Sequence, residues 1–219
     1  MPDAKPDVYL EPAGPVQIEE KIQRSVFIAR LEPCHDESSA RDFLNRVRTE
    51  HRDATHNCWA YLLNADAVSG RPETANSSDD GEPSGTAGRP ILGALRRSGL
   101  VNAMVIVTRY FGGVKLGVRG LIDAYGGAAA KALAAAKAVE CVPSCPVTAW
   151  LGWGAVGDVT RLLKSHAGKD DALQWDYGSP DGEVSVRADV PLSHAEALAR
   201  ELEALRAQKV ILRWSIPLG

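Results

Sequence analysis

The sequence has few of the features that mark disulfide-rich, zinc-binding or membrane-spanning proteins. Only 4 of its 219 residues are cysteine, and no uninterrupted apolar run approaches the roughly 20 residues that cross a membrane. So few cysteines do not build a disulfide framework, and they show no paired zinc-ligand spacing. We therefore expect four reduced thiols, at Cys34, Cys58, Cys141 and Cys145.

The sequence also lacks a large excess of charge and an apolar leader. Its formal net charge is −3, and 45% of its residues are hydrophobic, as in an ordinary globular protein. This charge excludes a protein that coats nucleic acid over its whole surface, but it allows a local basic patch. The N-terminus has no apolar core of a signal peptide, so we expect a cytoplasmic protein with no membrane partner.

The first two thirds of the chain predict a mixed sheet-and-helix domain. Residues 1–15 form a loose lead-in rich in proline and charge. Residues 64–83 form a long polar loop. Residues 16–20 look strand-like, and apolar runs predict strands at 25–31, 56–63 and 101–111. Helical spacing predicts one helix capped by Ser39 and ending near His51, one capped by Thr86 or Ser84 and ending at Ser98, and one over 121–139.

A second domain begins after Pro143 and Pro146, which mark a boundary. Strand and helix patterns then follow in the order β-α-β-β-α-β, the arrangement of ferredoxin-like domains. A turn is expected at 178–182, and Ser193 with Glu196 reads as a capping box. The predicted class is α+β with two domains, 16–140 and 147–219.

Glycine and positive charge are concentrated between residues 79 and 125. Several glycines precede a helix, where free backbone N–H groups and close approach favour an anion. The stretch is not a P-loop, because Val118 and Arg119 stand where Lys and Ser or Thr are required. It predicts an anion or nucleic-acid site made of Arg89, Arg109, Gly112, Gly113, Lys115, Gly117 and Arg119. Alternatively, the glycines serve turn geometry and Arg119 pairs with Asp123 at i+4.

Neighbouring polar residues suggest further chemistry. The acidic segment (Asp79, Asp80 and Glu82) could hold Mg²⁺ against a phosphate, or it could be a solvated turn. Ser84 with His56 and Asp80 suggests a hydrolase, and His51, His56 and Cys58 suggest a metal site, but neither set has a recognised spacing. We assign no metal, cofactor or catalytic residue. The residues of possible function are His56, Asp79, Asp80, Glu82, Ser84, Thr86 and Tyr110.

Aromatic residues offer a further interpretation. Trp59, Tyr61 and Tyr110 could stack on nucleobases, although aromatic side chains within strands more often belong to the core.

Two long motifs, at 79–90 and 107–117, resemble the signature of the Impact/YigZ family, and 56–61 also matches its pattern. The resemblance covers roughly residues 16–138 and departs at Val118-Arg119-Gly120. It implies a first domain of the ribosomal protein S5 domain 2-like class, a sheet backed by two helices, and a tail similar to domain V of elongation factor G. Eukaryotic relatives in this family regulate translation.

These observations lead to three functional hypotheses. The first is a non-enzymatic protein that binds RNA or the ribosome through Arg89, Arg109, Lys115 and Arg119. The second is an enzyme or sensor for a small phosphate-bearing ligand held at 112–117, with the acidic segment binding a metal. The third is a protein-interaction module in which the motifs are purely structural.

Overall fold

The computed structural model describes residues 8–63, 73–167, 173–177 and 183–216. The chain forms two compact units, whose described residues are 9–63 with 73–141 for the first and mainly 142–216 for the second. The expected turn at 178–182 and the first part of the expected loop, 64–72, lie outside the described residues. Among the helices that are described, none is long and apolar enough to cross a membrane.

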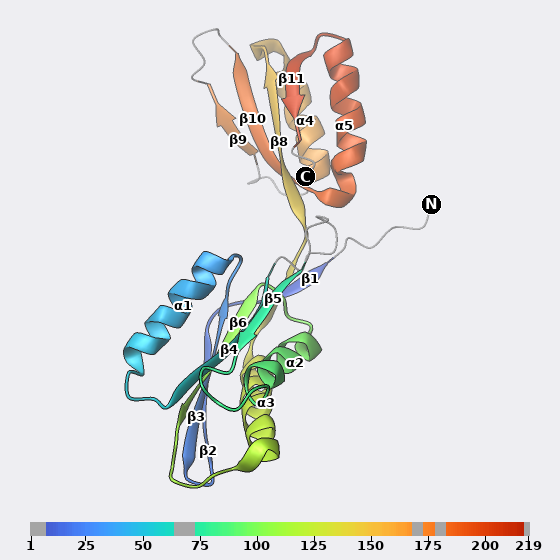
Figure 1. The fold of residues 1–219 in the computed structure, drawn as a ribbon. Coiled ribbons are helices and arrows are strands. Elements are labelled where there is room, and N and C mark those ends of the chain that lie inside the picture. Colours follow the sequence, from blue (N-terminus) through green and yellow to red (C-terminus); the bar gives the residue numbers. More distant parts are fainter. Residues whose placement is uncertain (1–7, 64–72, 168–172, 178–182, 217–219) are drawn as a thin grey trace. The chain divides into compact units, whose positions relative to one another are not determined.

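The first unit is built on a five-stranded antiparallel sheet (Figure 1). Its strands lie in the order β2 (Val16–Ile22), β3 (Ser25–Pro33), β6 (Ala103–Tyr110), β4 (His56–Leu63) and β5 (Thr74–Ser78). The central strand β6 is buried at nearly every residue, which explains its continuous apolar run.

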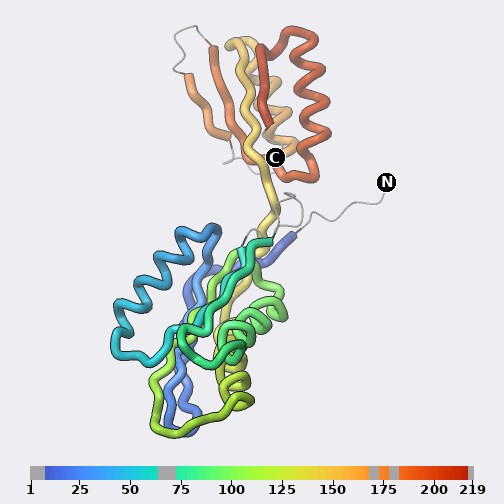
Figure 2. The backbone as a smooth tube through the Cα atoms, in the orientation of Figure 1, coloured from blue at the N-terminus to red at the C-terminus, as the bar shows by residue number. Residues whose placement is uncertain are grey.

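Helices cover both faces of this sheet (Figures 1 and 2). Helices α2 (Gly88–Ser98) and α3 (Gly117–Ala135) pack on one face, where Cys58, Ala60 and Leu62 of β4 point. Helix α1 (Glu37–Glu50) packs on the other face, against Tyr61 and Leu63. The alternation of side chains along β4 therefore separates two cores. The S5 domain 2-like expectation is confirmed, with α1 as a third helix.

Several predicted element boundaries were wrong. Helix α1 is capped by Asp36 rather than Ser39, because Ser39 is the third helical residue and closes a capping box with Asp36. Helix α3 begins at Gly117 and ends at Ala135, since the backbone becomes extended at Ala136.

Two short strands occupy residues that were expected to be irregular. Residues 138–141, predicted to be helical, form β7 (Ala138–Cys141) and pair with β1 (Tyr9–Pro12). The expected loose lead-in thus contains a strand, and the expected loop contains β5. Backbone hydrogen bonds hold these strands in place. Segments this short have too few residues to show a hydrophobic pattern, so the sequence does not reveal them.

The second unit is a ferredoxin-like domain, as the β-α-β-β-α-β pattern predicted. Its antiparallel strands lie in the order β11 (Ile211–Ser215), β8 (Ser144–Leu151), β10 (Val184–Pro191) and β9 (Leu173–Asp176). After β8 come the short 3-10 helix η1 (Trp153–Ala155) and α4 (Val156–Ala167), and α5 (Leu192–Ala207) precedes β11. Both α-helices contribute to one core with the sheet. The predicted Ser193 capping box is absent, because the N-cap of α5 is Pro191, two residues earlier, and it makes no side-chain cap hydrogen bond.

Candidate nucleic-acid interface

Asp79 caps helix α2 from outside the helix. Its carboxylate accepts backbone hydrogen bonds from Gly85 (2.8 Å), Ala87 (2.9 Å) and Gly88 (2.8 Å). Burial would raise the pKa of the Asp79 carboxyl, but these three hydrogen bonds together hold it below its usual value. Asp79 therefore occupies the anion position at this helix N-terminus, and neither Ser84 nor Thr86 caps the helix as predicted.

Asp80 ties the same loop to the sheet and orients His56. Its carboxylate accepts hydrogen bonds from the Asn57 backbone (2.7 Å) and from Arg48 (2.6 Å). Its carbonyl oxygen lies 2.8 Å from Nδ1 of His56, and a carbonyl oxygen can only accept. Nδ1 therefore carries a proton, and Nε2 of His56 faces Glu82 at 3.8 Å.

Glu82 and Arg109 form a buried ion pair. Their side chains are only 4% and 6% exposed, and the Tyr125 hydroxyl donates to the same Glu82 oxygen at 2.8 Å. Burial raises the pKa of Tyr125, so its hydroxyl keeps the proton that it donates. The guanidinium of Arg109 also lies 5.5 Å and 5.3 Å from the ring centres of Phe27 and Phe111. Arg109, predicted to contact phosphate, is buried in the structure and pairs with Glu82.

The acidic segment is therefore a set of structural carboxylates. Asp79 faces the start of α2, Asp80 faces Arg48, and Glu82 faces Arg109. No group of three His, Cys, Asp or Glu side chains that could hold a metal exists within the described part of the chain. The proposed Mg²⁺ role of this segment is thus contradicted by its geometry.

The residues of the other suggested sets mostly have partners outside those sets. The Cys58 thiol donates to the Asp79 carbonyl oxygen at 2.9 Å, and burial raises its pKa to about 12. Nδ1 of His51 pairs instead with the Tyr110 hydroxyl at 2.9 Å. Thr86 is buried and its hydroxyl donates to the Pro83 carbonyl oxygen, whereas Ser84 is exposed. All four cysteines are described, and each is a free thiol.

Turn geometry accounts for three of the predicted glycines. A Cβ at Gly112 would lie 1.9 Å from the Arg24 carbonyl oxygen, so only glycine allows this approach. Gly113 and Gly117 have φ angles of 83° and 72°, in the left-handed region. Lys115 lies in this loop, just before the start of α3, and its side chain is exposed.

A cavity of about 430 Å³ lies beneath this loop. Its lining includes both residues of the buried ion pair and the first turn of α3. The N-cap residue of α3, Leu116, makes no side-chain cap hydrogen bond. The lining residues are Thr55, His56, Glu82, Pro83, Arg109, Phe111, Lys115, Leu116, Gly117, Val118 and Leu121. The structure thus brings together His56, Glu82, Arg109, Lys115 and Gly117 of the predicted set.

The remaining predicted cations lie outside the cavity lining. The Arg119 side chain is 95% exposed and is 3.9 Å from Asp123, its i+4 neighbour. Arg89 is exposed on α2. Sequence reasoning assigned no role to Phe111, Val118 or Tyr125. Phe111 and Val118 are 45% and 62% exposed, and the available signal was their place beside the glycine-rich loop, Phe111 directly after β6 and Val118 in the first turn of α3.

A family model for the Impact N-terminal domain matches residues 23–133, just over half of the chain and all of the residues above from Arg24 to Tyr125. The chain belongs to the Impact family. The Escherichia coli IMPACT family member YigZ is 37% identical over 164 residues, which cover 74% of this chain and 78% of that relative. An IMPACT family member from Haemophilus influenzae is 43% identical over 128 residues, which cover 57% of this chain and 59% of that relative.

The solved structures include one close in length to this Impact-family chain. It is a crystal structure described as that of a hypothetical protein, which is 31% identical in sequence and has a TM-score of 0.68. The alignment covers 95% of this chain and 96% of the chain in that crystal structure. The likeness extends over both units, so the two-domain α+β architecture is shared with a solved protein.

Proposed function

We propose that this chain is a non-enzymatic RNA-binding protein that takes part in the regulation of translation, and that it contacts RNA at the start of α3. The observation that carries this proposal is the exposed Lys115 beside an uncapped helix N-terminus. The first N–H groups of a helix and a lysine ammonium both favour phosphate oxygens.

Exposed groups around Lys115 suit a nucleic acid. Arg119 lies in the first turn of α3 and adds a second exposed cation, and its ion pair with Asp123 is too exposed to hold it firmly. The half-exposed ring of Phe111 offers a surface on which a base can stack. Phosphate contacts and stacking together give binding with little sequence preference.

The residues behind this surface support it without touching RNA. Arg109 lies against the inner side of Phe111, and Glu82 and Tyr125 hold Arg109 in place. Gly112 and Gly117 shape the loop that carries Lys115. The link to translation rests on membership of the Impact family and on the regulatory role of its eukaryotic members.

The test is a titration of the full chain with a structured RNA at several salt concentrations, followed by fluorescence anisotropy. Lys115→Gln combined with Arg119→Gln should weaken binding and reduce the slope of log K against log salt by about 2, because each lost phosphate contact removes about 1. The matched control is Arg97→Gln with Lys137→Gln, which removes two exposed cations of the same unit, one in the last turn of α2 and one just after the end of α3.

An unchanged slope in the Lys115 and Arg119 variant, or equal losses in both variants, would contradict the proposal. The 430 Å³ cavity favours a second candidate, a small phosphate-bearing ligand. In that case RNA would not bind at low salt, while a nucleotide at 100 times its Kd would stabilise the protein by about 2.7 kcal/mol.

A further inference from the structure

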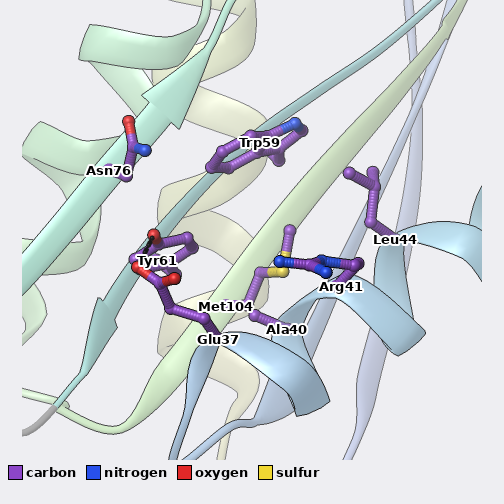
Figure 3. Close-up of a pocket in the computed structure, with 8 residues that line it drawn as sticks. All are labelled: Glu37, Ala40, Arg41, Leu44, Trp59, Tyr61, Asn76 and Met104. Atoms are coloured by element: carbon purple, nitrogen blue, oxygen red, sulfur yellow. Dashed lines mark hydrogen bonds between the residues drawn. The ribbon is translucent and has the colours of Figure 1, made fainter.

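A separate cavity lies on the opposite face of the sheet, between α1 and the strands. It has a volume of about 270 Å³, just below the roughly 300 Å³ at which the usual range of small-molecule sites begins. Figure 3 shows that α1 contributes one wall and that β4, β5 and β6 contribute the other. The lining residues are Glu37, Ala40, Arg41, Leu44, Trp59, Tyr61, Asn76 and Met104.

One wall carries an acid and a base that do not pair with each other. Glu37 and Arg41 stand four residues apart on α1, the spacing at which opposite charges usually form an ion pair. Glu37 instead accepts a hydrogen bond from the Tyr61 hydroxyl at 3.0 Å (Figure 3). Arg41 is exposed, and no carboxylate among the described residues lies within ion-pair distance of it. The cavity thus presents a separate negative and positive group about one helical turn apart.

The opposite wall is flat and aromatic. The rings of Trp59 and Tyr61 are stacked, with centres 5.6 Å apart and planes 8° from parallel. Trp59 is half-buried, so part of its ring faces the cavity. Met104 and Leu44 complete an apolar floor, and a thioether makes favourable contacts with aromatic rings. This wall suits a planar, apolar ligand body.

From these two walls we propose that the cavity binds a free amino acid with an aromatic side chain. The guanidinium of Arg41 takes the α-carboxylate, for which its paired N–H donors are matched. The carboxylate of Glu37 accepts from the α-ammonium, and the ring of the ligand rests against Trp59. A free amino acid is a small molecule whose ammonium and carboxylate groups are bonded to the same carbon atom, which matches two charged side chains one turn apart.

This proposal does not depend on RNA binding. The cavity lies on the α1 side of the sheet, whereas Lys115 stands at the start of α3, which packs on the other side. A failure of either proposal therefore leaves the other standing.

The test is isothermal titration of the full chain with L-tryptophan, L-phenylalanine and L-tyrosine. We expect binding of at least one of them. Tryptamine, which lacks the carboxylate, and indole-3-propionate, which lacks the ammonium, should bind at least about tenfold more weakly than L-tryptophan, a loss of about 1.4 kcal/mol. Arg41→Gln and Glu37→Gln should each weaken L-tryptophan binding by a similar factor.

The matched control is Arg52→Gln, which removes an exposed cation just after the end of α1 and should not change the affinity. Circular dichroism checks that each variant keeps its fold, and Gln is compatible with helix. The proposal is overturned if no aromatic amino acid binds at millimolar concentration. It is also overturned if tryptamine or indole-3-propionate binds as tightly as L-tryptophan, or if Arg41→Gln leaves the affinity unchanged.

Discussion

At the scale of single residues, the decisive feature is the buried pair of Glu82 and Arg109. Two buried charges are tolerated because each is paired and hydrogen-bonded: Glu82 to Arg109 and Tyr125, and Arg109 also to Ser25. Removing one partner of such a pair is far more costly than removing an exposed charge, since the remaining ion stays buried without compensation.

We therefore expect Arg109→Met to lower the free energy of unfolding by about 3–5 kcal/mol. Arg97→Met, at an exposed position on α2, should change it by less than about 0.5 kcal/mol. Urea unfolding measures both. The double variant Arg109→Met with Glu82→Leu should lose less than the two single losses added together, because no lone charge is left buried. Equal effects of Arg109→Met and Arg97→Met would mean that the pair contributes nothing.

The sequence could indicate which residues gather near the site but not which of them face water. Arg109 and Lys115 look equivalent in the printed sequence. In the structure, however, Arg109 is buried, with 5% of its surface exposed, whereas Lys115 faces solvent. Arg109 is the last buried residue of β6, and its carboxylate partner lies 27 residues earlier in the chain. Such a pairing depends on the tertiary fold, which local patterns do not encode.

At the scale of elements, α2 depends on a cap that stands eight residues before its own N-cap residue. Asp79 accepts from three backbone N–H groups at the start of this helix, and Arg89 adds a favourable charge nearby. This arrangement ties β5, which ends at Ser78, to the start of α2. The close approach also explains Gly88, where a Cβ would lie 2.9 Å from the Ser78 backbone.

Asp79→Ala should destabilise the protein by about 0.5–2 kcal/mol near neutral pH, the usual cost of losing an N-cap. Because the folded pKa of Asp79 lies below its unfolded value of about 3.9, its contribution is complete above that pH. The contribution is then lost as the pH falls through the folded pKa. The difference between wild type and Asp79→Ala should therefore shrink below about pH 4, as denaturant unfolding at several pH values can measure.

Asp79→Asn serves as the control, because asparagine is also a good N-cap but does not titrate. It should retain part of the stability at neutral pH, because its single amide oxygen can accept from Ala87 and Gly88 but not also from Gly85. A difference between wild type and Asp79→Ala that stays constant from pH 7 to pH 3 would contradict the assignment of the carboxylate.

Long patterned elements were predictable, and short paired strands were not. The apolar face of α1 (Ala40, Phe43, Leu44 and Val47) follows directly from helical periodicity, and the strand at 56–63 follows from its apolar run. Strands β1, β5 and β7 have only four or five residues each and exist because a neighbouring strand supplies their hydrogen bonds. Their positions therefore depend on where distant segments lie.

At the scale of the whole molecule, the two units have separate hydrophobic cores. The cores of the first unit draw on residues from Phe27 to Leu133, and the core of the second on residues from Cys145 to Ile211. Strand β7 belongs to the first unit through its pairing with β1, and β1 also bonds to Val101 through the Leu10 carbonyl oxygen. The first unit therefore ends after Cys141 rather than at the end of α3.

We expect a fragment of residues 9–141 to fold on its own and to unfold in one cooperative transition, because it contains complete cores and all the partners of its strands. A fragment that stops at residue 136 lacks β7 and leaves β1 without its strand partner, so it should melt at a lower temperature. Calorimetry of both fragments checks this, and equal melting temperatures would show that β7 adds no stability. If the 9–141 fragment fails to fold, the stability of the first unit must come from the ferredoxin-like unit. A folded fragment that binds RNA with the same salt slope as the full chain would instead place RNA binding in the Impact-family unit alone.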